Sequence, residues 1–188
     1  MRDETRTANL LGAAALALSD LLLSEATGLA ATSGSGAGAL VVLSTDPGLG
    51  VTELGRRVGL TQSAAARMVD GLERRGLVRR EAGPGRAVAV RLTAAGERAA
   101  RGLLASRAAA LTEALHCLDA PERDQLDVLL GKLLTGLYRR PGDAERLCRL
   151  CDRGACVRDD AVCPVGQADR DHRARTDASR TGRGTGHG

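Results

Sequence analysis

The chain has 188 residues and is 43% hydrophobic, which suits one folded domain with appendages. It has no Trp, no Phe and one Tyr, so its core must be aliphatic, and it lacks the aromatic platforms on which single-stranded nucleic acids stack. The formal net charge is +4, and Lys132 is the only lysine, so the positions of the arginines matter more than their number. Among nucleic acids, duplex DNA is the better candidate partner.

The first predicted element is a long helix over residues 7–30, rich in leucine and alanine. Leu11, Leu18 and Leu22 recur at helical spacing, and further leucines widen the apolar surface beyond what one neighbouring helix buries. We therefore expect residues 1–30 to form a dimerisation helix. A core helix of a monomer is the alternative.

The apolar run at residues 10–18 raises the question of a targeting signal. A secretory signal peptide is disfavoured, because the preceding MRDETRT is not net basic and because Asp20 and Glu25 interrupt the apolar residues that follow. No stretch approaches the length of a membrane span. We expect a cytoplasmic protein.

Residues 32–38, TSGSGAG, have the composition of a flexible connection. Residues 39–44 predict a short apolar helix, which the sequence Asp46-Pro47-Gly48 ends. The predicted DNA-binding region, residues 39–96, begins with this helix.

Residues 51–75 predict two short helices joined by a compact turn at Gly59 and Leu60, the pattern of a helix-turn-helix. Thr61 is a suitable N-cap for the second helix. At about 100° per residue, its apolar side chains gather on one face and leave the opposite face free to enter a groove of DNA. The candidate base-reading residues are Gln62, Ser63 and Arg67, with Ala64 and Ala66 positioned for thymine methyl groups.

A β-hairpin is predicted after Gly76, which suits the C′ position of the preceding helix, because strands at residues 77–81 and 88–92 flank a turn rich in Gly and Pro. Alternation along the second strand predicts that one face of the hairpin is buried, and that this face carries Val88, Val90 and Leu92.

Positive charge is concentrated on the predicted helix-turn-helix and hairpin. From Arg56 to Arg91 there are nine arginines and three acidic residues, a net charge of +6, whereas the whole chain carries +4. Arg79 and Arg80, on the first strand, are candidates for contacts with DNA phosphates, which fix the register of a protein on the duplex.

The run PGLGVTELGRRVGLTQSAAARMVDGLERRGLVRREAGPGRAVAVRLTAAG resembles the winged helix-turn-helix of MarR-family transcriptional regulators. The resemblance is carried by the TQS start of the recognition helix, the GLVRR entry to the wing, an arginine near the wing tip and the LTxxG exit. In helix order it extends over about residues 5–140. It implies a mainly α fold with a small β-hairpin wing, dimerised through the N- and C-terminal helices, with Arg86 in the minor groove. Family wings usually carry an Asp two residues before that arginine, where this chain has Pro84.

Two further helices follow the hairpin. Thr93 caps a helix predicted to reach about Leu118, and the sequence DAPE at residues 119–122 begins another. The resemblance assigns residues 97–140 to dimerisation. A symmetric dimer would place two recognition helices ~34 Å apart, which predicts a palindromic operator. MarR-like proteins also bind small-molecule effectors, but no residue here identifies one.

His116 and Cys117 lie side by side near the end of the long helix. Adjacent helical residues point about 100° apart, so these two cannot converge on one metal ion or substrate atom. We expect Cys117 to be a small buried apolar residue, with redox sensing as the alternative.

Four of the five cysteines fall within 16 residues in a C-x2-C-x4-C-x6-C spacing: Cys148, Cys151, Cys156 and Cys163. Four thiolates suit tetrahedral Zn²⁺ or an iron–sulfur cluster. Structural zinc is the preferred hypothesis for residues 148–164 because its tolerance of spacing is broad. An iron–sulfur cluster and reduced or switching thiols are the alternatives, whereas disulfides are disfavoured in a reducing cytoplasm.

Residues 165–188 contain few apolar side chains and predict a disordered tail, whose arginines are either solvated or add sequence-independent affinity for DNA.

The sequence as a whole predicts a dimeric regulator that binds specific sites in double-stranded DNA. One alternative is a winged-helix protein-interaction module with a zinc-stabilised docking segment, and another is a regulator that senses redox state or metal through its cysteines. An enzyme is disfavoured, since no nucleophile–base pair or cofactor loop is evident.

Overall fold

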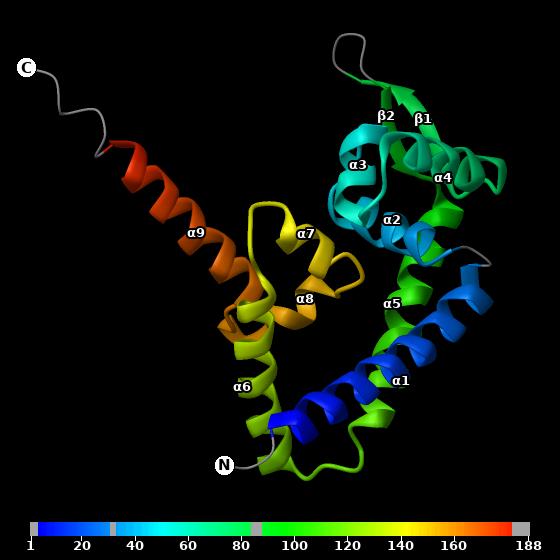
Figure 1. The fold of residues 1–188 in the computed structure, drawn as a ribbon. Helices are drawn as coiled ribbons and strands as arrows, with labels where there is room; N and C mark the ends of the chain where they lie inside the picture. The colour runs from blue at the N-terminus through cyan, green and yellow to red at the C-terminus, as the bar shows by residue number, and fades with distance from the viewer. Residues whose placement is uncertain (1–3, 31–32, 84–87, 182–188) are drawn as a thin grey trace, which may run out of the picture.

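The computed structural model describes residues 4–30, 33–83 and 88–181. It has the predicted mainly α fold with a two-stranded hairpin (Figure 1). The elements are α1 (Glu4–Ala30), α2 (Gly34–Thr45), α3 (Val51–Val58), α4 (Gln62–Arg74), β1 (Val78–Ala82), β2 (Val88–Leu92), α5 (Ala94–Ala114), α6 (Ala120–Leu137), α7 (Asp143–Leu147), α8 (Arg153–Cys156), the 3-10 turn η1 (Arg158–Asp160) and α9 (Pro164–Thr181).

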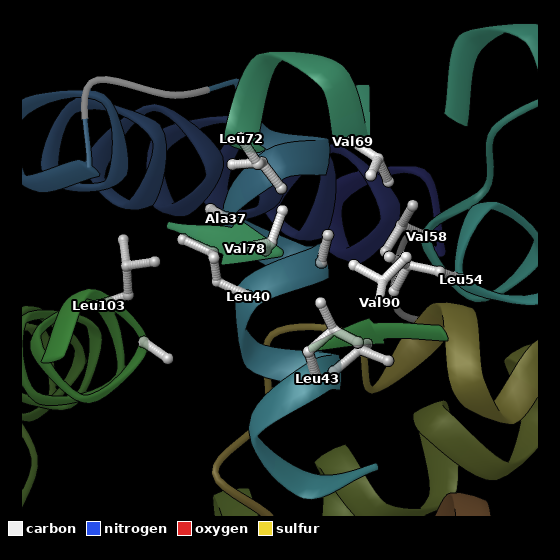
Figure 2. Close-up of a cluster of buried hydrophobic side chains, with 13 residues drawn as sticks. Ala37, Leu40, Leu43, Leu54, Val58, Val69, Leu72, Val78, Val90 and Leu103 are labelled. Carbon is white, nitrogen blue, oxygen red and sulfur yellow. The ribbon is translucent and has the colours of Figure 1, made fainter. Parts of the chain in front are cut away.

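Helix α2 is the centre of the reading head, which we define as residues 33–93. Side chains from α2, α3, α4, both strands and α5 meet in one aliphatic core around it (Figure 2). The flexible connection expected at residues 32–38 is wrong from Ser33 onwards: Ser33 caps α2 by accepting a hydrogen bond from the Gly36 amide, and residues 36–43 are all buried. Burial against neighbouring elements stabilises this glycine-rich first turn, which helix propensity alone disfavours.

The helix-turn-helix forms at the predicted residues. Gly59, at φ 78°, ends α3, and the Thr61 side chain caps α4 by accepting from the Ala64 amide at 3.4 Å. The two helices approach closely, since a Cβ placed on Gly55 would lie 2.5 Å from the Ala65 Cβ. Gly55 therefore fixes how α4 crosses α3.

The hairpin is antiparallel, with Val78 opposite Leu92 and Ala82 opposite Val88, and Leu49 bridges to Val90 on its other edge. The predicted burial pattern is wrong at the outer end. Val88 is 47% exposed, whereas Val90 is fully buried and Ala89, on the opposite face, is also buried. Figure 1 shows that the hairpin projects beyond the helices of the reading head, which accords with the exposure of Val88 at the outer end of β2.

The reading head joins α5 through a tight contact. Thr93 caps α5 by accepting from the Gly96 amide at 3.1 Å, and its hydroxyl donates to the Gly76 carbonyl at 2.6 Å. A Cβ on Gly96 would lie 1.9 Å from the Leu77 carbonyl oxygen, so only glycine fits.

Helix α5 contributes Ala100 and Leu103 to the core of the reading head, whereas α6 contributes none of its described residues. Helix α1 packs along α5 (Figure 1), while α6 begins with a capping box formed by Asp119 and Glu122 and buries none of its residues.

The expected burial of Cys117 is wrong: it is exposed in the turn between α5 and α6, where its thiol donates to the Ala114 carbonyl. None of the helices in the described ranges is long and apolar enough to cross a membrane.

We define the C-terminal extension as residues 139–181. It includes residues 165–181, for which the expectation of a disordered tail is wrong. Helix α9 runs to Thr181 because its first turns pack on α6: Val165 and Ala168 form a second small core with Tyr138. The Tyr138 hydroxyl donates to Asp169 at 2.8 Å, and its ring lies edge-on to His172. The last seven residues of the expected tail, 182–188, lie outside the described residues.

Candidate nucleic-acid interface and thiol cluster

Helix α4 presents the predicted reading face. Ala65, Val69 and Leu72 are buried beneath the helix. On the opposite side Gln62, Ser63 and Arg67 are exposed, and the other two predicted base-contacting residues, Ala64 and Ala66, are partly exposed. The structure thus brings all five together on one surface, which we call the reading face.

Arg67 is distinct among the charged groups of this surface. Within the part of the chain that the structure describes, its guanidinium has no hydrogen bond or ion-pair partner. An exposed, unpaired arginine on a recognition helix is available for two parallel hydrogen bonds to a guanine.

Arg79 and Arg80, predicted to hold phosphates, differ in their surroundings. The Arg79 side chain is 60% exposed and pairs with Glu81 at 2.6 Å on the same strand. Arg80 is more enclosed, pairing with Asp70 at 2.6 Å and with Glu73, both on α4. The hydrogen bond that Arg80 donates to the Asp70 carboxylate is the main reason that the pKa of Arg80 is raised. Arg80 therefore attaches the wing to the recognition helix. Arg86 and Pro84 lie outside the described residues.

Acidic residues neutralise the arginines of α3. Glu53 accepts hydrogen bonds from Arg56 and Arg57, and Arg57 also pairs with Asp46. The hydrogen bond from Arg56 is the main cause that lowers the pKa of Glu53 to about 2. Part of the +6 net charge counted from Arg56 to Arg91 is thus neutralised by ion pairs within the protein. The reading face keeps Arg67 as its unpaired cation.

The C-terminal extension docks on the reading head, a contact that sequence reasoning missed. Arg56 of α3 pairs with Glu145 of α7 at 3.2 Å, and Leu150 packs against the core of the reading head. Figure 1 shows α7 lying between α9 and α3. One sequence signal was available: Leu147 and Leu150 each directly precede one of the first two cysteines and lie at helical spacing. Leu147 packs into the small core around Tyr138, and Leu150 packs into the core of the reading head.

The four clustered cysteines are all free thiols. Cys148, Cys151 and Cys163 are half-buried, and the Cys163 sulfur accepts a hydrogen bond from the Gly166 amide at 3.4 Å in the first turn of α9. A hydrogen bond between the side chains of Cys148 and Cys151 lowers the pKa of Cys151 to about 6 and raises that of Cys148.

The thiols are gathered but do not converge. Throughout residues 4–30, 33–83 and 88–181, no three His, Cys, Asp or Glu side chains lie close enough together to hold a metal ion as they stand. Arg107 of α5 and Arg149 lie near Cys151, and the Arg107 Nε is buried without a hydrogen-bond partner.

A small apolar cavity of about 20 Å³ lies between α1, α2 and α5. Its lining includes Leu22, Val41, Leu103, Arg107 and, from the C-terminal extension, Leu150. This volume corresponds to about one water molecule. In this state of the chain the cavity is too small for an aromatic effector.

Comparison with known proteins gives a consistent result. Residues 33–87 match the model of the MarR family. A solved MarR-family transcriptional regulator from Silicibacter pomeroyi is 30% identical, with 70% of this chain and 90% of that chain covered and a TM-score of 0.54. YusO from Bacillus subtilis is 25% identical, with 71% and 96% covered and a TM-score of 0.61. No curated protein matches the chain.

A third relative was solved with ligands. The Mycobacterium tuberculosis MarR family protein Rv2887, in complex with DNA, is 28% identical, with 65% of this chain and 96% of that chain covered and a TM-score of 0.53. The same protein was also solved with p-aminosalicylic acid, at 29% identity and a TM-score of 0.50. These relatives are covered almost completely, whereas part of this chain has no counterpart in them.

Proposed function

We propose, because the chain belongs to the MarR family of transcriptional regulators, that it binds a palindromic operator in double-stranded DNA as a homodimer. The family membership makes it a DNA-binding regulator of transcription and not an enzyme. The proposal that the chain binds a specific operator rests on the reading face of α4, with its exposed and unpaired Arg67.

The reading face supports a definite division of roles. Arg67 suits guanine, Gln62 suits adenine, and Ser63 accepts several bases. Ala64 and Ala66 are small enough to contact thymine methyl groups. Arg79 contacts a phosphate, while Arg80 holds the wing in place against Asp70 and Glu73. By family resemblance, Arg86 enters the adjacent minor groove.

The apolar surfaces of α1 and α6 support the homodimer. On α1 Leu16 is 70% exposed, and on α6 Leu133 is 45% exposed. Other large apolar side chains on these two helices are also exposed: Leu10, Leu11, Leu18, Leu21, Val128, Leu129, Leu130 and Leu137. So many exposed leucines are unusual on a monomer and are covered when two copies pair through these helices.

The test uses the full chain and random duplex DNA. Repeated selection of bound fragments should yield an inverted repeat with half-site centres about one helical turn apart, ~34 Å. Sedimentation should show two protomers per operator. Recovery of a strictly monomeric protein, or of fragments with no shared sequence, would remove this proposal.

The competing hypothesis is a protein-interaction module with a zinc-stabilised docking segment. It predicts no retention on duplex DNA, whereas phosphate-contacting arginines predict retention that falls steeply with salt. A transcriptional regulator acts where the DNA lies, and we propose the cytoplasm as its compartment.

A small-molecule effector is part of the proposal, because Rv2887 was solved with p-aminosalicylic acid. We infer that such an effector would enter the small cavity that is lined by Arg107 and by apolar side chains such as Leu22 and Leu150. An anionic aromatic effector would pair with Arg107 only after Leu150 moves. Binding of such a compound should therefore alter the position of the C-terminal extension.

A further inference from the structure

The C-terminal extension carries a group of side chains that DNA binding does not use. It lies outside residues 33–87, which match the family model, and it holds four of the five cysteines. We propose that Cys148, Cys151, Cys156 and Cys163 bind one Zn²⁺ ion as four thiolates, and that this ion holds the extension together.

The backbone brings the four cysteines toward one place. Cys148 and Cys151 form a single turn, in which the Cys151 amide donates to the Cys148 carbonyl at 2.9 Å. Cys156 ends α8, and Cys163 stands at the start of α9. Between them the chain reverses at Asp159 and Asp160, both in the left-handed region at φ 54° and 61°. This reversal, held in a costly conformation, precedes Cys163, and Cys148 and Cys163 both pack against the small core around Tyr138.

The environment of Cys163 already resembles that of a metal-bound thiolate. Its sulfur accepts a hydrogen bond from the Gly166 amide at the start of an 18-residue helix, where the helix dipole favours negative charge. Backbone hydrogen bonds to ligand atoms are the usual outer support of a metal site.

The charges around the cluster fit an anionic centre. Zn²⁺ with four thiolates carries a net charge of −2. Arg107 and Arg149 lie near Cys151, and the buried Nε of Arg107 has no hydrogen-bond partner among the residues that the structure describes. A buried donor without a partner is destabilising, and a thiolate sulfur beside Arg107 would supply an acceptor for it.

The extension also needs a support that its small core does not give. Helices α7 and α8 have five and four residues, and neither buries an apolar side chain completely. Segments this short depend on metal ions or disulfides for stability, and here the cysteines are free. Binding would draw the sulfurs from their present separation to Zn–S distances of about 2.3 Å, which corresponds to roughly 3.8 Å between sulfurs.

The spacing favours zinc over an iron–sulfur cluster. The ferredoxin run C-x2-C-x2-C-x3-C-P shares with this chain only its first pair and its final Cys-Pro, because the two later loops are longer here. Zinc sites tolerate such variation.

The experiment uses the full chain, purified under reducing conditions and stripped with a chelator. Titration against a chromophoric competitor should show one Zn²⁺ per chain, and Co²⁺ in its place should give the visible absorption of a tetrahedral thiolate complex. Each of C148S, C151S, C156S and C163S should weaken Zn²⁺ binding at least tenfold. C117S, which changes the exposed cysteine outside the cluster, is the matched control and should bind like the native chain.

Several outcomes would overturn the proposal: stoichiometry well below one, equal loss in C117S, or co-purified iron with acid-labile sulfide. The Co²⁺ spectrum of the native chain decides the question even if a serine variant fails to fold. The site is independent of DNA recognition, so Zn²⁺ binding without operator binding would contradict only the proposed function.

Discussion

Arg56 on α3 donates a hydrogen bond of 3.2 Å to Glu145 on α7, a residue 89 positions later in the chain. The same arginine is held by Glu53 on its own helix, and Gly142 leaves room for it, since a Cβ there would lie 2.9 Å from its Nη1. The first helix of the helix-turn-helix is therefore joined directly to the segment that carries the cysteines.

The substitution E145Q should loosen this attachment without unfolding the protein. The Glu145 side chain is 27% exposed, so solvent screens the ion pair and the loss should stay near 1 kcal/mol. Hydrogen exchange should become faster in α7 and in the last turn of α3, which carries Arg56, and unchanged in α5. E113Q is the matched control, because the one ion pair of Glu113 among the described residues is with His116, at the far end of α5 from the reading head. Equal exchange in both variants would show that the contact does not hold α7.

The substitution R67A should relax base specificity. If Arg67 makes two hydrogen bonds to a guanine, its loss should cost about 1–3 kcal/mol on the operator and much less on random DNA. Fluorescence anisotropy with both duplexes measures the difference. R101A removes the same charge from α5, where Arg101 is exposed and lies 4.0 Å from Glu97, and should change neither affinity appreciably. Equal weakening on both duplexes by R67A would mean that Arg67 contacts a phosphate.

The contacts of Arg80 with α4 predict a change in DNA affinity opposite to the change expected from charge alone. E73Q removes a negative charge from the DNA-binding element, so simple electrostatics predicts tighter binding. We expect weaker binding, because Glu73 accepts from both the side chain and the backbone amide of Arg80 and thereby holds the wing against α4. Titrations of native and E73Q protein on the same operator decide between the two. Tighter binding by E73Q would show that the wing does not depend on this contact.

Glu53 should contribute to stability in a defined pH range. Its pKa is about 2 in the folded chain, against 4.5 for the unperturbed group, chiefly because of the hydrogen bond from Arg56. A lowered pKa means that the stabilisation is complete above pH 4.5 and is lost as the pH falls toward 2. The side chain is 40% exposed, so screening limits the effect to about 1 kcal/mol or less. Urea unfolding of native and E53Q protein should therefore differ at pH 6 and converge near pH 2. If native and E53Q protein differed in unfolding free energy by the same amount at both pH values, the effect of the substitution would come from packing.

Local signals explain which parts of the fold could be predicted. Thr61, Gly76 and Thr93 act through neighbouring backbone groups, and all three occupy the predicted cap or turn positions. The exposed positions of Gln62 and Arg67 follow from helical periodicity, which needs no knowledge of the partner elements.

The parts that failed depend on tertiary contacts. The glycine-rich start of α2 is helical because surrounding elements bury it, and Val88 is exposed because the hairpin extends past the core. Helix α9 is ordered through Val165, a residue that looks isolated in the sequence. The pairs between Arg80 and α4, and between Arg56 and α7, have no local signal, because the spacing between partners is set by the fold.

Tyr138 is the only aromatic side chain apart from histidine in the chain, and it lies at the junction of α6 and α9. Ultraviolet emission from this protein therefore originates at a single point, beside Asp169 and His172. Detachment of α9 would change the quantum yield of that emission, while circular dichroism would still report the remaining helices. The native chain thus contains its own optical probe of the junction, and no dye or introduced tryptophan is needed to follow it.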